Sequence, residues 1–274
     1  MQTDTITPEM AWRLEQVECA AFADCYHAAP PDVAAKCGVA VHEVGQAIAA
    51  VVGCADVLGL NRIVGPGVLS PADEEVLDSV LHKYEVAGVR RLFVQVDPVT
   101  SATTVIDLLE ARGGSHYNNW VKLYRGVEPL APVVCDLRVE AIDRTHASEF
   151  GRIVAESFGW PEMFQQVVAA TVGRDGWRHY MAFDGDQPAA TAAMYVSEGA
   201  GWIDFAATLE GYRGRGAQGK LVELRIADAA AMGCELLVVE TAQQTSDHSA
   251  PSYRNMLRYG FQEAYVRPNY LIEL

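Results

Sequence analysis

The stretch GYRGRGAQGKL, residues 211–221, decides between two folds for this chain. From Gly214 it reads G-x-G-x-x-G, the pattern with which dinucleotide-binding folds bring a pyrophosphate to a helix N-terminus. From Arg213 it reads R-x-x-G-x-x-G and runs into an apolar helix, which suits a different phosphate-bearing cofactor. Glu240 closes a later apolar run, at about the spacing from the loop where a dinucleotide-binding fold has the acidic residue that binds the ribose. Binding of a nicotinamide cofactor is therefore the first interpretation to test.

The segments around this loop disfavour the dinucleotide fold. A dinucleotide fingerprint directly follows a buried parallel strand, whereas the polar turn 209–213 separates this loop from a strand predicted at 201–208. That strand alternates polar and apolar residues, as antiparallel strands with unlike faces do. Only 34 residues follow Glu240 in the 274-residue chain, too few to complete a doubly wound domain. The loop is better explained as a nest of N–H groups from Arg213 to Gly219 that holds a pyrophosphate.

Segment order predicts two copies of one α/β unit in tandem. Two prolines follow the strand-like residues 118–126 and place a boundary near residue 130, giving predicted domains 1–130 and 131–274. The second half follows the order β-α-α-β-β-β-α-β-α-β, and the first half repeats it in weaker form. The predicted fold class is therefore α/β with mixed α+β sheets. Helices are predicted at 10–28, 70–88 (capped by Ser70), 103–114, 145–158, 161–172 (with Pro161 at its first position), 215–232 and 251–259. Strands are predicted at 43–53, 60–68, 89–97, 117–126, 133–142, 178–185, 188–199, 201–208, 235–242 and 260–274.

Composition excludes several functional classes. A net charge of −15 and a pI near 4.8 disfavour nucleic acid as a partner. The histidines show no metal-ligand spacing, so no metal site is expected. No apolar run reaches bilayer length and the N-terminus lacks a signal-peptide pattern, so we expect a cytoplasmic protein without a membrane partner. The cysteines form no C-x-x-C pair and are expected to be buried free thiols, at positions Cys19, Cys25, Cys37, Cys54, Cys135 and Cys234.

Residues 133–274 resemble the GNAT superfamily of N-acetyltransferases. The family's acyl-CoA loop, [QR]-x-x-G-x-[GA], is matched from Arg213 to Gln218, with Gln218 where a small residue is usual. The resemblance implies acetyl-CoA as cosubstrate and a splayed strand whose backbone pairs with the pantetheine arm. It also implies that the first half is similar to the degenerate unit of tandem members. The cofactor-binding residues that it implies are Phe205, Ala206, Ala207, Arg213, Gly214, Arg215, Gly216, Ala217, Gln218, Gly219, Asn255 and Arg258.

Candidate catalytic residues follow from the chemistry of acyl transfer. The amine must lose a proton before attack, and Asp204 and Glu240 are the candidate bases. Glu240 has an alternative role as a carboxylate that caps a helix or pairs with an arginine. A tyrosine often protonates the departing thiolate in this family, but its usual position here is Met256. Tyr253 and Tyr259 lie three residues to either side, and Tyr253 is the favoured acid.

The leading hypothesis is acetyl-CoA-dependent transfer of an acetyl group to the amine of a small molecule or peptide, by a monomer or homodimer. The alternative is a catalytically silent acyl-CoA-binding module, because Met256 replaces the usual tyrosine. We expect the first half to bind no CoA, since Pro66 removes an N–H donor from its loop and acidic residues 73–75 open the following helix. That half would instead shape the acceptor side.

Overall fold

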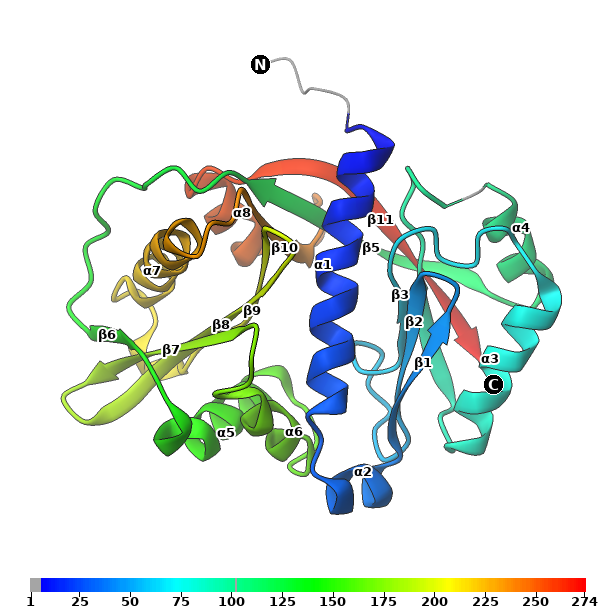
Figure 1. Cartoon of the computed structure of the whole chain (residues 1–274), viewed down its shortest axis with the longest axis horizontal. Coiled ribbons are helices and arrows are strands. Elements are labelled where there is room, and N and C mark those ends of the chain that lie inside the picture. The colour runs from blue at the N-terminus through cyan, green and yellow to red at the C-terminus, as the bar shows by residue number, and fades with distance from the viewer. Residues whose placement is uncertain (1–5, 102) are drawn as a thin grey trace.

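The computed structural model describes residues 6–101 and 103–274. Their strands form one eleven-stranded mixed sheet in the order β1-β2-β3-β4-β11-β5-β10-β9-β8-β7-β6 (Figure 1). The mixed α/β fold class is confirmed. The strands are β1 Val39–Val44, β2 Ala47–Val52, β3 Arg62–Val64, β4 Arg91–Gln95, β5 Ser115–Arg125, β6 Arg138–Ala141, β7 Trp177–Asp184, β8 Gln187–Ser197, β9 Ala200–Thr208, β10 Leu236–Ala242 and β11 Gln262–Glu273. The helices are α1 Pro8–His27, α2 Pro31–Cys37, α3 Glu74–Val86, α4 Thr104–Ala111, α5 Ala147–Phe158, α6 Phe164–Thr171, α7 Ala217–Ala231 and α8 Pro251–Arg258, with 3₁₀ turns η1 Arg144–His146 and η2 Glu210–Tyr212.

The two halves of the chain exchange strands at the centre of the sheet. The last strand, β11, lies antiparallel between β4 and β5, so it extends the sheet of the first half. In turn β5 pairs antiparallel with β10 and extends the sheet of the second half. The sheet is therefore continuous across the two halves. The division into domains 1–130 and 131–274 stays a prediction.

Helices cover both faces of this sheet. On one face α1 lies between the two halves, where its apolar side packs with α5, α6 and the sheet in a single core (Figure 1). On the other face a second core joins α3 and α4 to the first half, and a third joins α7 and α8 to the second. Among the described residues no helix combines the length and the apolar character needed to cross a bilayer.

Two helices, α3 and α6, start later in the chain than predicted. Asp73, rather than Ser70, caps α3, because its Oδ1 accepts hydrogen bonds from the N–H groups of Glu75 and Val76 at 2.9 and 3.2 Å. Pro161 does not begin α6, which starts at Phe164 after a turn closed by the Phe164 N–H to the Pro161 carbonyl. The predicted strand 43–53 crosses a turn: residues 43 and 44 end β1, the chain turns at Gly45, and only Ala47–Val52 form β2 of this hairpin.

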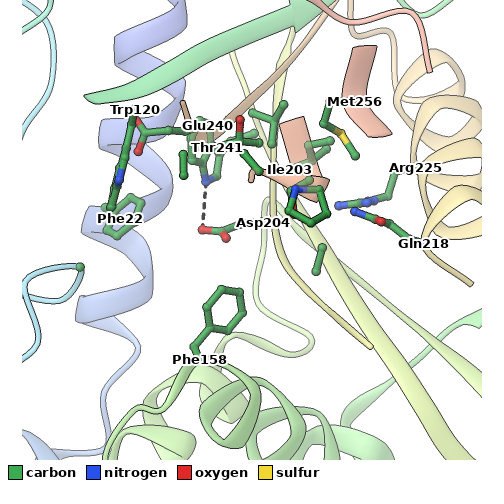
Figure 2. Close-up of a pocket in the computed structure, with 18 of the residues that line it drawn as sticks. Phe22, Trp120, Phe158, Ile203, Asp204, Gln218, Arg225, Glu240, Thr241 and Met256 are labelled. Carbon is green, nitrogen blue, oxygen red and sulfur yellow. Dashed lines mark hydrogen bonds between the residues drawn. The ribbon is translucent and has the colours of Figure 1, made fainter. Parts of the chain in front are cut away.

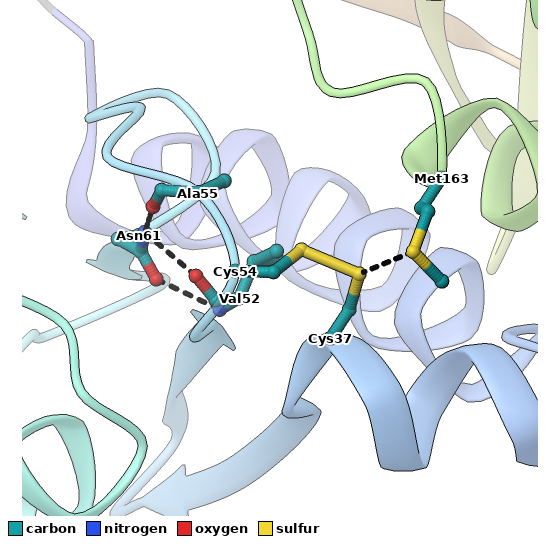
Figure 3. The surroundings of a disulfide bond; sticks show 6 residues. All are labelled: Cys37, Val52, Cys54, Ala55, Asn61 and Met163. Carbon is teal, nitrogen blue, oxygen red and sulfur yellow. Dashed lines mark hydrogen bonds between the residues drawn. A yellow bond between two sulfur atoms is a disulfide. The ribbon is translucent and has the colours of Figure 1, made fainter.

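The expectation of free thiols is wrong for one cysteine pair. Cys37 and Cys54 form a disulfide, with their Cα atoms 4.6 Å apart (Figure 3). The β1–β2 register explains this bond, because Val39 pairs with Val52 and each cysteine lies two residues beyond that pair. Sequence spacing alone carries no sign of a register, so the pairing was not predictable. The remaining described cysteines, Cys19, Cys25, Cys135 and Cys234, are free.

Strands β9 and β10 run parallel for three residue pairs and then separate. Their pairing ends at Trp202 with Val238, after which β10 continues against β5. Beyond Asp204 the register between β9 and β8 also shifts, so Phe205 and Ala206 pair with neither neighbouring strand. Phe205 has a φ of +51°, a strained value for a bulky residue that its packing in the core maintains. The opening between β9 and β10 positions the candidate site.

Candidate functional site

Two adjoining cavities occupy the opening between β9 and β10. The first, which we call the loop cavity, has a volume of about 700 Å³ and lies between the glycine-rich loop, the end of β9 and α8. The second, the aromatic cavity, has a volume of about 470 Å³ and lies between β9, β10 and α1. Both volumes fall in the range of small-molecule sites.

The loop cavity has the backbone of an anion site. Gly214 and Gly216 adopt φ values of +82° and +86°, which only glycine reaches without strain. Gly216 is the N-cap of α7, and no described side chain caps this helix. The N–H groups of the first turn are therefore free to bind an anion, and the helix dipole favours negative charge there.

Most of the predicted cofactor-binding residues meet at this cavity. Arg215 does not, because its guanidinium forms ion pairs with Asp136 at 2.9 Å and Asp184 at 2.7 Å. Phe205 does not either, since its ring is buried and stacks on Trp177 at 5.6 Å. The predicted residues that do line the cavity are Ala206, Ala207, Arg213, Gly214, Gly216, Ala217, Gln218, Gly219, Asn255 and Arg258. Arg213 and Arg258 are the exposed cations at the rim of this set.

The aromatic cavity draws its walls from both halves of the chain. Rings from α1 and β5 meet rings from β9 and from the end of α5, and two carboxylates and two guanidinium groups complete the wall (Figure 2). The first half therefore contributes to this wall, while its predicted role at the acceptor side stays a prediction. The aromatic residues are Phe22, Trp120, Phe158, Trp160 and Trp202, and the charged ones are Arg62, Asp204, Arg225 and Glu240.

The two cavities meet at a shared set of residues around the splayed strand. Ala206 lies in the middle of this junction, in the part of β9 that has no register partner on β8 or β10. A group that lies in the loop cavity can therefore reach a group that lies in the aromatic cavity. The residues that border both are Phe158, Ala206, Gln218, Arg225, Pro251 and Ser252.

Asp204, one of the two candidate bases, projects into the aromatic cavity and is half-buried (Figure 2). Its Oδ1 accepts from the Phe205 N–H at 2.7 Å and its Oδ2 accepts from the Trp202 indole at 3.2 Å. It makes no ion pair with a described residue. Burial raises the pKa of Asp204, because the surrounding groups solvate a charge less well than water. Such a carboxylate is suited to accepting a proton.

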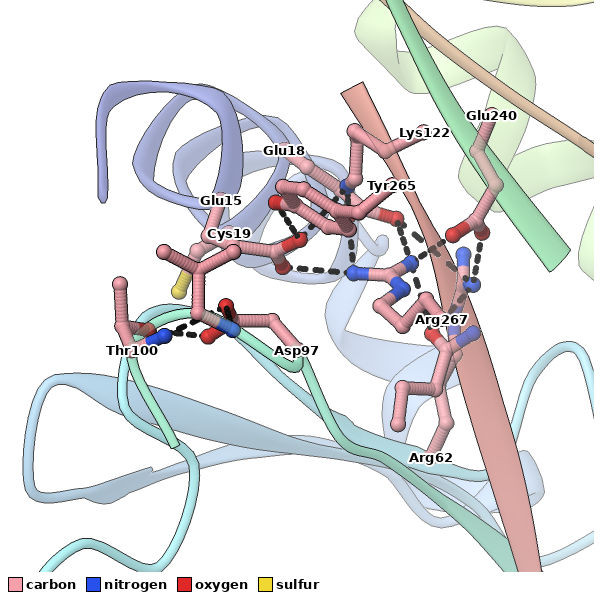
Figure 4. A network of polar contacts seen from close by, with 12 residues as sticks. Glu15, Glu18, Cys19, Arg62, Asp97, Thr100, Lys122, Glu240, Tyr265 and Arg267 are labelled. Atoms are coloured by element: carbon pink, nitrogen blue, oxygen red, sulfur yellow. Dashed lines mark hydrogen bonds and ion pairs between the residues drawn. The ribbon is translucent and has the colours of Figure 1, made fainter. Parts of the chain in front are cut away.

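Glu240 also lines the aromatic cavity but belongs to a buried charge cluster (Figure 4). Its carboxylate pairs with Arg267 and, at 3.4 Å, with Arg62. Burial raises the pKa of Glu240, and the positive charge of Arg267 opposes that shift. The arginine pairing that was its alternative role is therefore present.

The rest of the charge cluster joins α1 to the sheet. Glu15 and Glu18 of α1 pair with Arg267 of β11 at 2.6 and 2.8 Å, and both also pair with Lys122 of β5. Acidic and basic side chains are equal in number in this cluster when Glu240 and Arg62 are included. Because each charge has partners of the opposite sign, the cluster fixes α1 over the exchanged strands.

The structure does not bring Tyr253 to the cavities. Its hydroxyl donates a hydrogen bond to Glu263 on β11, and this contact raises the pKa of Tyr253 to about 12. Tyr259 lines the loop cavity, where its hydroxyl lies against Gly219, and Met256 lines the aromatic cavity. The hydroxyl that borders both cavities is that of Ser252, one helical turn before Met256.

Sequence reasoning missed Arg225 and most of the aromatic wall. Arg225 looks like an ordinary polar residue of α7, yet it is only 1% exposed. Phe22 and Trp120 lie in the other half of the chain, so no local pattern connects them with Asp204. A signal for Arg225 did exist, because it follows the apolar Leu221 by one helical turn and so lies on the same side of α7.

Comparison with known proteins now identifies the class. Residues 141–261 match the sequence model of the Acetyltransferase (GNAT) family. This segment contains β9, the glycine-rich loop, α7 and α8, so every residue that lines the loop cavity lies within the matched region. The aromatic cavity also draws on residues outside it. The match shows a GNAT acetyltransferase domain at residues 141–261, and this family supports an acyl-CoA N-acyltransferase activity.

Solved structures extend the likeness to the whole fold. A GCN5-related N-acetyltransferase from Kribbella flavida is 13% identical, with a TM-score of 0.59, over 98% of this chain and 96% of that one. One from Sphaerobacter thermophilus is 14% identical, with a TM-score of 0.59, over 97% and 93%. A tandem GNAT protein from the clavulanic acid biosynthesis pathway is 15% identical, with a TM-score of 0.50, over 77% and 74%. At these identities the likeness concerns fold, and it supports the arrangement of two GNAT-like units. No curated protein matches the sequence.

Proposed function

We propose that this protein is an acetyl-CoA-dependent N-acetyltransferase whose acceptor is a small amine. The observation that carries the proposal is the junction at Ala206, where a cavity built to hold an anion opens into an aromatic cavity that contains a carboxylate. A thioester and an amine held in these cavities would meet at the unpaired strand segment 205–206.

The loop cavity fits coenzyme A in its chemistry. The first-turn N–H groups of α7, together with Arg213 and Arg258, would hold the phosphates. Ala206 and Ala207 would offer backbone groups to the pantetheine arm, in the manner of a strand added to an open edge. When bound, acetyl-CoA supplies an acetyl group that is activated as a thioester.

Three residues around the junction would each have one role in acyl transfer. The Ala206 N–H would polarise the carbonyl, because backbone N–H groups stabilise developing negative charge on oxygen. Asp204 would accept the amine proton, since it lies in the aromatic cavity without an ion-pair partner. Glu240 is less suited to that task because two arginines bind its carboxylate. Ser252 would place a hydroxyl beside the leaving sulfur.

The second candidate is an acyl-CoA-binding module without catalysis. Its supporting observation is that Met256 lines the aromatic cavity where the family usually has a tyrosine, and that Tyr253 faces Glu263 instead. This candidate predicts CoA binding without turnover.

One experiment separates the two candidates. Calorimetric titration with acetyl-CoA measures binding, and release of free thiol in the presence of a panel of primary amines measures turnover. We expect one binding site per chain and thiol release that depends on the amine. Binding without release for any amine would favour the silent module, and absence of binding would refute both.

A further inference from the structure

Arg225 is a buried cation whose binding capacity is only partly used. It is 1% exposed, and its Nε and Nη1 donate to the carbonyl oxygens of Leu221 and Ala193 at 3.0 and 3.3 Å. Its remaining N–H groups have no described partner, and it makes no ion pair within the described ranges. Buried arginines normally pair with a carboxylate, since burial of an unpaired charge is costly. That cost appears as a pKa lowered to about 10 by burial.

Arg225 lies where two reactants would meet. Its side chain borders both cavities, together with Ala206 and Gln218, and its guanidinium reaches the wall of the aromatic cavity (Figure 2). The Tyr180 hydroxyl donates to Asp228, and the negative charge of Asp204 acts on Arg225 without forming an ion pair with it. An anion held in the cavities could therefore bind the N–H groups of Arg225 that have no described partner.

The charges of the aromatic cavity complement a zwitterion. Of the four charged residues in its wall, Arg62 and Glu240 pair with each other at 3.4 Å. Asp204, which attracts a cation, and Arg225, which attracts an anion, then remain without an ion-pair partner among the described residues. Both line the same cavity, and the charge of Asp204 acts on Arg225, so their ligands would be groups on one molecule. The amine and carboxylate of an α-amino acid are attached to one carbon atom and meet this requirement.

We propose that the acceptor is an α-amino acid with an aromatic or large aliphatic side chain, whose carboxylate binds Arg225 while its amine lies by Asp204. The side chain would occupy the space between Phe22, Trp120 and Phe158. This proposal rests on the proposed function for its amine, while the carboxylate site stands on the geometry of Arg225 alone. The same guanidinium would also suit a carboxylate at the end of the acyl group, so the test must distinguish the two sources.

Three ligands that differ by one group test the site by binding. Calorimetry on the full chain, with and without CoA, would compare L-phenylalanine with phenethylamine, which lacks the carboxylate, and with 3-phenylpropanoate, which lacks the amine. We expect phenylalanine to bind at least about 30-fold more tightly than phenethylamine, as a buried charge pair requires. Equal affinity for these two ligands overturns the proposal. Because binding is measured without CoA as well, a failure of CoA binding would refute the proposed function separately.

Variants then assign the effect to the guanidinium. Arg225→Gln should remove the preference for phenylalanine, Arg225→Lys should retain part of it, and Arg178→Gln, which removes an exposed arginine outside both cavities, should leave it unchanged. A preference that persists in folded Arg225→Gln overturns the assignment. If Arg225→Gln does not fold, the wild-type ligand comparison decides alone. Faster thiol release from succinyl-CoA than from acetyl-CoA with phenethylamine would place the carboxylate on the acyl group and overturn its placement on the acceptor.

Discussion

A single added charge at the start of α7 tests the anion site most directly. Gln218 is the second residue of α7, lines the loop cavity and accepts a hydrogen bond from Asn255 at 2.6 Å. Gln218→Glu keeps the shape of the side chain and the acceptor for Asn255, but places a carboxylate among the N–H groups that would hold phosphates. Gly216 is a poorer target, because a Cβ there would meet the Val134 carbonyl oxygen at 2.2 Å and disturb the loop.

The expected loss of affinity can be estimated from the helix geometry. The new carboxylate would lie within about one helical turn, roughly 6 Å, of the N–H groups and of any anion that they bind. Two unit charges at about 6 Å repel by ~0.7 kcal/mol in bulk water and by ~2.8 kcal/mol at an effective dielectric constant of 20. A pyrophosphate carries about two such charges, so the repulsion is about 1.4 kcal/mol in bulk water. Because the cavity is open to water, we expect the loss of binding free energy to lie between this value and about 2.8 kcal/mol, which weakens the Kd roughly 10- to 100-fold.

The assay is calorimetric titration with CoA, supported by thermal unfolding. A carboxylate near a helix N-terminus stabilises the helix, so the Tm should not fall. The matched control is Gln165→Glu, the same change at the second residue of α6, which lines neither cavity. An unchanged CoA affinity in folded Gln218→Glu, or an equal loss in the control, would refute the assignment of the phosphate site to α7.

Further predictions concern the acid–base groups and the disulfide. Asp204→Asn should lower kcat by about 100-fold or more and remove the limb of the pH–rate profile that rises as the carboxylate ionises. Glu240→Gln should keep that limb. The reverse pattern would make Glu240 the base. Because burial raises the pKa of Asp204, the native state loses stability as the pH rises through that pKa. Asparagine does not ionise, so the free energy of unfolding of Asp204→Asn, measured in urea, should increase relative to that of the wild type as the pH rises. Tyr253→Phe should leave kcat within about 3-fold of the wild type, because the hydroxyl faces Glu263; a loss near that of a general acid, about 100-fold, would restore Tyr253 to the mechanism. Alkylation before reduction should leave Cys37 and Cys54 unlabelled, and reduction should cost about 2 to 3 kcal/mol of unfolding free energy for a loop of this size; labelled cysteines would contradict the bond.

Local patterns predicted the loop, while tertiary contacts decided which of its residues are available. The glycines and the start of α7 follow from neighbouring residues, because positive φ and free helix N–H groups are local properties. Arg215 appeared equivalent to Arg213 in the sequence, yet Asp136 and Asp184 from other segments bind it. Two aspartates that are distant in sequence but close in the fold therefore make Arg215 unavailable to the site, while Arg213 stays available.

The same limit applies to the catalytic side chains. Asp204 was predictable because alternation in a strand fixes the face on which a side chain lies. The direction of Tyr253 depends on how α8 packs beside β11, and the surroundings of Arg225 depend on both cavities, so neither followed from periodicity. The aromatic wall depends on Phe22, which α1 brings across the sheet from the first half.

The exchange of β5 and β11 has a consequence for how the protein is made. During synthesis β4 has no neighbour on its β11 side until residues 262–273 leave the ribosome, because β11 occupies that place in the finished sheet. An unpaired strand edge readily pairs with other chains, so the nascent protein is exposed to aggregation until its final strand is made. Arg267, the arginine that pairs with α1, arrives on that same strand, and until then Glu15 and Glu18 have only Lys122 and Arg62 as described partners of opposite charge. The first half is thus translated early but completed last, and synthesis that stops before β11 would leave a chain in which neither the sheet nor the wall of the aromatic cavity is complete.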